Sequence, residues 1–116
     1  MNLKELEKKF ESLEEKVRTL EDIERIKILQ RAYGYYVDNM MYDDVADLFT
    51  DDGTLEIGPS FVMGKENIRN LFRRGMFKMP EDGTKRLYVH MQLQSVVHID
   101  QGGQIAKGRW QMICSD

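Results

Sequence analysis

Residues 23–49 constrain the fold most, because apolar side chains recur there at helical spacing, stop, and then resume. The apolar members are Ile23, Ile26, Leu29, Ala32, Tyr33, Tyr36, Val37 and Met40, followed by Val45, Leu48 and Phe49. The pattern predicts two amphipathic helices, the first ending with Asn39 as a left-handed cap and the second beginning near Tyr42. Three tyrosines and Asp38 lie close together at the end of the first helix. Burial of a carboxylate in an apolar core is costly, so Asp38 does not fit the role of a core residue.

A second periodic segment precedes this one, with apolar residues alternating three and four apart among Glu and Lys, the pattern of a coiled-coil seam. Its members are Leu3, Leu6, Phe10, Leu13, Val17 and Leu20. Such a helix either covers one side of its own domain or pairs with a partner chain, and both alternatives stay open. The phase shifts near Asp22, and with Thr19 and Asp22 as candidate N-caps we expect a new helix or a kink there. The chain is therefore divided into an amphipathic N-terminal helix, residues 1–20, and one α+β domain, residues 21–116.

Composition excludes several classes of protein. The 116 residues suffice for one domain with a real core, and a net charge of -3 draws the chain neither to nucleic acid nor to an anionic membrane surface. Cys114 is the sole cysteine, so an internal disulfide is excluded and a reducing cytoplasm is indicated. Apolar runs are too short for a membrane span or a secretion signal. We therefore predict a cytoplasmic protein that binds neither nucleic acid nor membrane.

The rest of the chain alternates short extended segments with one helix. We expect strands at residues 54–57 and 61–63, a helix at 65–74, a loop with apolar residues at 75–85, and long strands at 87–99 and 104–113. The first long strand exceeds the usual length, so a bend or bulge is expected in it. This order predicts an α+β fold in which helices cover one face of a curved antiparallel sheet.

One face of the first long strand mixes polar and apolar side chains: Tyr88, His90, Gln92, Gln94, Val96 and His98. That mixture suits the lining of a cleft, and an exposed sheet face with a surface histidine is the alternative. If the helices cover this face, Asp38 can orient His90 as a general base, and a tyrosine can donate to a carbonyl or enolate oxygen. Tyr33 and Asp38 are about 140° apart on an ideal helix, so they converge only if the helix ends or distorts before Asp38.

Metal and cofactor sites are not predicted. His90 and His98 lie eight strand residues apart, about 26 Å, and cannot share a metal ion. Calcium-loop spacing, a Gly-rich phosphate loop and an activated-serine elbow are all missing from the sequence. The proton chemistry available to His90 and Asp38 requires neither a metal nor a cofactor.

Several segments together resemble a SnoaL-like protein of the nuclear transport factor 2-like superfamily. They are Leu20 through Phe49, Asp51-Asp52-Gly53-Thr54, Met63-Gly64-Lys65 with Ile68 and Leu71, Val89-His90-Met91, and Gly108-Arg109-Trp110. Within that superfamily the chain is most similar to the branch of bile-acid 7α-dehydratase and, more distantly, scytalone dehydratase. The resemblance implies an α+β cone, a curved sheet around a pocket closed by N-terminal helices, assembled as dimers or trimers. Family members continue with further long strands, whereas this sequence stops at Asp116, so C-terminal strands are expected to be missing.

The resemblance also assigns roles to residues. In the dehydratase branch a tyrosine near the end of the first helix, an aspartate five residues on, and a histidine followed by methionine carry acid-base chemistry. These positions correspond to Tyr33, Asp38 and His90. By position, the wall of the pocket would include Tyr36, Met63, Phe72 and Trp110.

Our leading hypothesis is a cofactor-independent dehydratase or isomerase acting on a hydrophobic, polycyclic or steroid-like carbonyl compound. The competing hypothesis is a non-catalytic ligand-binding or assembly module in which His90 and Asp38 form a buried structural pair. A third is an interaction domain dominated by the N-terminal helix. Because this superfamily reuses one pocket for several reactions and for plain binding, the fold does not determine the reaction.

Overall fold

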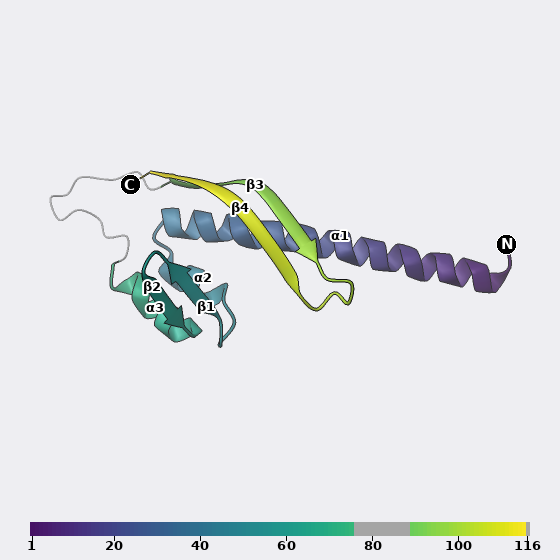
Figure 1. The fold of residues 1–116 in the computed structure, drawn as a ribbon, viewed down its shortest axis with the longest axis horizontal. Helices are drawn as coiled ribbons and strands as arrows, with labels where there is room; N and C mark the ends of the chain where they lie inside the picture. The colour runs from purple at the N-terminus through teal and green to yellow at the C-terminus, as the bar shows by residue number, and fades with distance from the viewer. Residues whose placement is uncertain (76–88, 116) are drawn as a thin grey trace.

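The computed structural model describes residues 1–75 and 89–115 of the chain. Its elements are α1 (Leu3–Asp38), α2 (Tyr42–Asp47), β1 (Thr54–Ile57), β2 (Ser60–Met63), α3 (Lys65–Arg73), β3 (Val89–Ile99) and β4 (Ala106–Ser115), shown in Figure 1. The predicted helices and strands are confirmed within a few residues, apart from the start of α1. The apolar loop with Met76, Phe77 and Met79 lies outside the described residues.

A single long helix, α1, sets the shape of the molecule. Its 36 residues extend about 54 Å, and its N-terminal end projects beyond the other elements (Figure 1). The radius of gyration is 19.1 Å, against about 13 Å for a compact chain of this length. Of the two alternatives expected near Asp22, a new helix or a kink, the new helix was wrong, because α1 continues through this residue. Thr19 does not cap a helix, since its hydroxyl donates to the Glu15 carbonyl (3.0 Å) within α1.

The C-terminal end of α1 is a Schellman turn centred on Met40. Met40 takes the left-handed conformation (φ 57°), and the N–H groups of Met40 and Met41 donate to the carbonyls of Val37 and Tyr36. The prediction that Asn39 occupies the left-handed position was wrong, because Asn39 has φ -102°. Its side-chain amide instead donates to the Tyr35 carbonyl at 2.8 Å, which closes the last turn.

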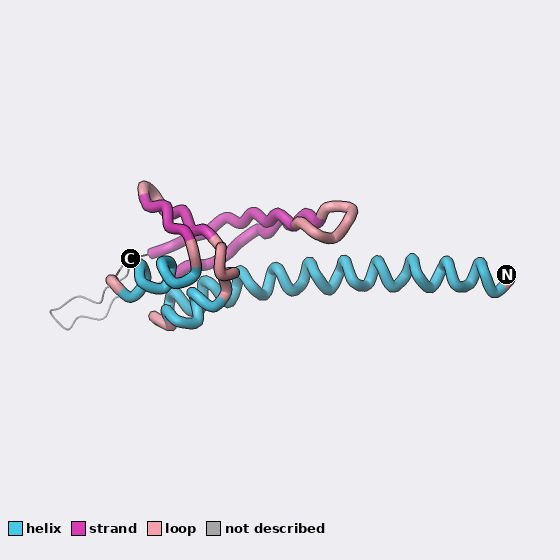
Figure 2. Tube along the Cα trace, turned by 90° about the horizontal axis from the view of Figure 1, so that it is seen from below, coloured by secondary structure: helices cyan, strands magenta, loops and turns pink. Residues whose placement is uncertain are grey.

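The core lies where the end of α1 meets α2, α3 and the β1–β2 pair (Figure 2). Five apolar side chains are fully buried there: Val37, Val45, Ala46, Ile68 and Phe72. The Tyr42 ring stacks on Phe72 with 5.9 Å between centroids. Arg69, whose side chain is 14% exposed, joins α3 to α2 through ion pairs with Asp43 (3.0 Å) and Asp47 (2.7 Å). Apolar burial therefore holds the small helices against the end of α1, and the ion pairs join α2 to α3.

The β3–β4 hairpin crosses α1, and β3 contacts the helix (Figure 1). A bulge interrupts the antiparallel register between Leu93 and Val96, where Gln94 has φ 49°. The expected bulge is thus confirmed, but it inserts one residue and reverses the side-chain alternation beyond it. His98 therefore faces away from His90, and the prediction that both point the same way was wrong. Val96 and the His98 side chain are accordingly exposed, at 66% and 76%.

The described elements confirm the α+β class, with a helix laid against antiparallel strands. Across residues 1–75 and 89–115, none of the helices is both long and apolar enough to cross a membrane.

Candidate active site

One stripe of α1 faces β3, and it consists of Gln30, Gly34 and Asp38. These residues are four apart, so they lie above one another on the helix. The Gln30 amide Nε2 donates to the Gln92 Oε1 at 3.1 Å, and Asp38 contacts His90. The stripe therefore positions the helix on the strand through two polar contacts, with Gly34 between them.

Gly34 allows the helix to approach the strand closely. A Cβ atom built on Gly34 would lie 2.9 Å from the His90 backbone oxygen and 3.4 Å from the Gln92 side-chain nitrogen. An alanine would be too close to the strand backbone for an ordinary contact. Sequence reasoning missed this residue, although a lone glycine inside a helical pattern signals such an approach.

Asp38 and His90 form the central pair of the site. The Asp38 Oδ1 lies 2.5 Å from the His90 Nδ1, and its Oδ2 accepts a hydrogen bond from the His90 backbone N–H at 3.2 Å. The His90 side chain is 9% exposed and the Asp38 side chain 23%. An ionised Asp38 favours the tautomer with the proton on Nδ1, which makes Nε2 the basic nitrogen. The geometry thus fixes the orientation of the His90 ring at the junction of α1 and β3.

Tyr33 lies on a different side of α1. The helix stays regular through Asp38, so the distortion that would bring Tyr33 toward Asp38 is not seen. Tyr33 instead packs against the core and lines an open hollow of about 300 Å³ together with Leu48 and Phe49. Burial raises the pKa of its phenol. The structure therefore brings together two of the three predicted catalytic residues, Asp38 and His90, and directs Tyr33 to the core side of the helix.

The four expected wall residues are dispersed. Tyr36 is half-buried against the core, with its ring edge-on to that of Tyr35, and Phe72 is fully buried inside the core. Met63 is 62% exposed and lines a hollow of about 300 Å³ between β2 and α3. Trp110 is half-buried on β4, with its ring over Gly108. The role of these four residues as pocket walls stays a prediction.

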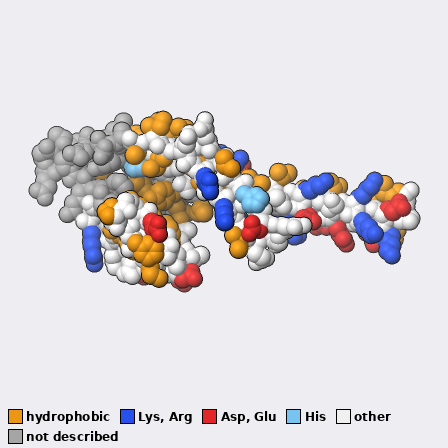
Figure 3. Space-filling model, viewed as in Figure 1, with side chains coloured by type: hydrophobic (Ala, Val, Ile, Leu, Met, Phe, Trp, Pro, Cys, Tyr) orange, Lys and Arg blue, Asp and Glu red, His pale blue; other side chains and the backbone are white. Residues whose placement is uncertain are grey.

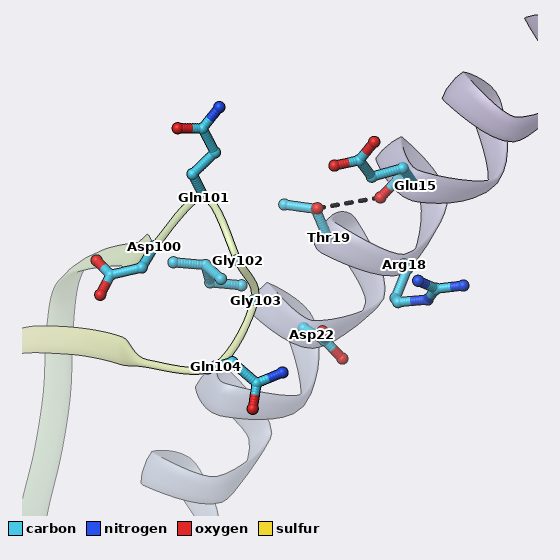
Figure 4. A pocket seen from close by; sticks show the side chains of 10 residues that line it. Glu15, Arg18, Thr19, Asp22, Asp100, Gln101, Gly102, Gly103 and Gln104 are labelled. Atoms are coloured by element: carbon cyan, nitrogen blue, oxygen red, sulfur yellow. Dashed lines mark hydrogen bonds between the residues drawn. The ribbon is translucent and has the colours of Figure 1, made fainter. Parts of the chain in front are cut away.

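A separate hollow of about 380 Å³ lies between the β3–β4 turn and α1 (Figure 4). Besides Ile99 and the two turn glycines, its lining consists of polar residues: Glu15, Arg18, Thr19 and Asp22 of α1 lie beside the turn at residues 100–104. Neither Asp38 nor His90 lines this hollow, nor any of four other hollows on the described residues. The His-Asp pair is therefore distinct from these hollows.

Fold and pair together define a class: an α+β protein in which a helix covers an antiparallel sheet and a His-Asp pair joins the two. The sequence profile of the SnoaL-like domain matches residues 18–114, and the chain belongs to that family. Comparison with curated proteins gives no match.

Among solved structures, the fold is similar to an NTF2-like protein with a cystatin-like fold from Novosphingobium aromaticivorans. The TM-score is 0.71 and the sequence identity 24%, over 88% of this chain. The match covers 64% of the chain from N. aromaticivorans, so the present sequence spans less than two thirds of that protein. The similarity supports the fold and leaves the reaction open.

Proposed function

We propose that this SnoaL-like domain is a cofactor-independent acid-base enzyme, a dehydratase or isomerase. Its substrate would be a hydrophobic polycyclic or steroid-like carbonyl compound. The observation that carries the proposal is the contact between Asp38 and His90, 2.5 Å between Oδ1 and Nδ1, at the junction of helix and sheet. The resemblance to the bile-acid 7α-dehydratase and scytalone dehydratase branch supports the substrate class.

His90 would act as the base and Asp38 as its orienting partner. The Nε2 atom would take a proton from the carbon beside the substrate carbonyl and leave an enolate. In a dehydration, the enolate electron pair would then expel the β-hydroxyl group, protonated by the imidazolium, as water. In an isomerisation, the imidazolium would return the same proton to another carbon. Both sequences balance without a cofactor.

Tyr33 would donate a hydrogen bond to the enolate oxygen. Because its ring packs beside Leu48 and Phe49, this role requires a substrate that reaches both sides of the end of α1. Tyr36, Met63, Phe72 and Trp110 would contribute the apolar wall. A cytoplasmic location and an assembly of two or three chains complete the proposal.

The hydrogen bonds of Asp38 favour a second function. Both of its oxygens are occupied by His90, one by the ring and one by the backbone N–H, and the ring is 9% exposed. Such a pair can serve to fix β3 on α1 in a non-catalytic ligand-binding or assembly module. The two functions differ in what the loss of His90 removes: turnover in the first, and stability alone in the second.

The experiment compares His90→Ala with His98→Ala, because His98 lies on the same strand with its side chain 76% exposed. Proton abstraction is measured by NMR as deuterium incorporation beside the carbonyl of a panel of steroid-like and polycyclic ketones. We expect exchange by the wild type and by His98→Ala, and none by folded His90→Ala. Exchange retained in His90→Ala would overturn the enzymatic assignment. A wild type inactive on the whole panel, with His90→Ala destabilised, would favour the structural pair.

A further inference from the structure

The N-terminal half of α1 carries an exposed apolar seam. Six side chains at alternating spacing of three and four are each more than half exposed: Leu3, Leu6, Phe10, Leu13, Val17 and Leu20. They occupy the a and d positions of three heptads, and shallow hollows lie between them. The next a and d positions are Glu24 and Lys27, so the seam ends at Leu20.

The folded domain leaves this seam open. The turn of the β3–β4 hairpin approaches α1 at Glu15, Arg18, Thr19 and Asp22, the f, b and c positions (Figure 4). At 100° per residue these positions centre about 180° from the seam. The hairpin therefore covers the outer face of the helix and does not obstruct pairing through a and d.

The charges beside the seam specify its partner. The e positions are Glu7, Glu14 and Glu21, all acidic, while the g positions Lys9 and Lys16 are basic. Basic and acidic side chains both lie along the N-terminal part of α1 that projects from the domain (Figure 3). In a parallel pair, each g residue faces the e residue of the next heptad on the other helix. In an antiparallel pair, e faces e and g faces g, so like charges would meet.

We propose that residues 3–20 of α1 pair with the same residues of a second copy as a parallel two-stranded coiled coil. Lys9 would then pair with Glu14 of the partner subunit, and Lys16 with Glu21 of the partner subunit. Leucine at every d position and Val17 at an a position favour two strands. Three heptads are short, so the dimer dissociates on dilution.

Charge reversal tests the pairing. Lys9→Glu with Lys16→Glu makes the flanking e and g charges acidic throughout, and Glu14→Lys with Glu21→Lys makes them predominantly basic. Analytical ultracentrifugation from about 1 μM to about 1 mM chain measures the dimer constant. We expect each double variant to weaken self-association at least about tenfold, and an equimolar mixture of the two to form a heterodimer. The control, Lys4→Glu with Lys8→Glu, changes the net charge equally at b and f positions and leaves dimerisation intact.

Orientation is tested by crosslinking. In a Cys114→Ser background, Leu6→Cys places a thiol near one end of the seam, and mild oxidation should join two parallel chains through it. An antiparallel pair would place Leu6 near Val17 and leave the thiols apart.

Three results would overturn the proposal. They are a monomeric wild type at about 1 mM, an oligomer indifferent to both charge reversals, and a dimer that fails to crosslink through the thiol at position 6. Circular dichroism of each variant verifies that α1 remains helical, so that a loss of pairing is assigned to the changed charges and not to a lost helix.

Discussion

Gly34→Ala should destabilise the protein, although alanine ordinarily stabilises a helix. Exchanging Gly for Ala in a helix interior contributes about 1 kcal/mol of stability when space is available. At Gly34 the new Cβ would lie 2.9 Å from the His90 backbone oxygen, so helix and strand must separate by several tenths of an ångström. Overpacking of this kind costs about 1–3 kcal/mol. The net expectation is a loss of up to about 2 kcal/mol in the free energy of unfolding.

Urea unfolding followed by circular dichroism measures the change in the free energy of unfolding. In thermal unfolding, each kcal/mol corresponds to a shift of about 4–8 °C in melting temperature. Gly102→Ala is the matched control, because nothing lies within 4 Å of a Cβ built there. Gly34→Val should be worse than Gly34→Ala, since a branched side chain enlarges the clash. The amide resonance of His90 provides a local readout, because its N–H donates to Asp38 at 3.2 Å.

A Gly34→Ala variant that gains about 1 kcal/mol would refute this reasoning. The gain would mean that helix propensity alone decides the outcome and that α1 does not depend on close contact with β3. An unchanged His90 amide shift would point the same way. A loss of stability with a shifted amide would instead link the glycine to the geometry of the His-Asp pair.

Three further predictions concern the region around the core. Burial raises the pKa of Tyr33, so its contribution to the free energy of unfolding is fully present below about pH 10 and is lost as pH rises through the raised pKa. In urea unfolding at alkaline pH, Tyr33→Phe should reduce this loss of stability, and Tyr35→Phe, at an exposed position, should not. Arg69→Met should lower the free energy of unfolding, and by less in high salt than in low salt. Hydrogen bonding to Arg69 lowers the pKa of Asp43, so the difference in stability between wild type and variant should shrink as pH falls through that lowered pKa. Phe72→Ala should cost about 3–5 kcal/mol in urea unfolding, because its side chain is fully buried, and a much smaller loss would contradict its place in the packed core.

The meeting of Asp38 and His90 could be predicted from the sequence because neither residue suits the apolar pattern around it. Period-two alternation placed His90 on a strand face, and period-3.6 spacing placed Asp38 on the last turn of a helix. A carboxylate and an imidazole displaced from solvent require partners, so each is a natural partner of the other. Their catalytic role stays a prediction, because contact alone does not distinguish a base from a structural tie.

Three details were beyond sequence reasoning because tertiary contacts decide them. Met40 takes the left-handed position that residue type assigned to Asn39, and its N–H donates to the carbonyl of the buried Val37. The bulge was anticipated, but its position was not, and one extra residue decides that His98 faces away from His90. Gly34 signals a close approach by its place in the helical pattern, but the tertiary fold decides that β3 is the element that approaches it.

The apolar pattern changes phase at Asp22 because the surroundings of α1 change there, while the helix itself continues. A proline substitution tests this continuity. If a second helix began after an Asp22 cap, Ile23 would be its first residue, where proline is well tolerated. In the continuous α1, the same proline removes a backbone hydrogen bond and clashes with the preceding turn, at a cost of about 3 kcal/mol or more. Ile23→Pro should therefore lose helical ellipticity relative to Ile23→Ala, which removes the same side-chain contacts. Equal ellipticity and equal stability of the two variants would restore the interpretation of two separate helices.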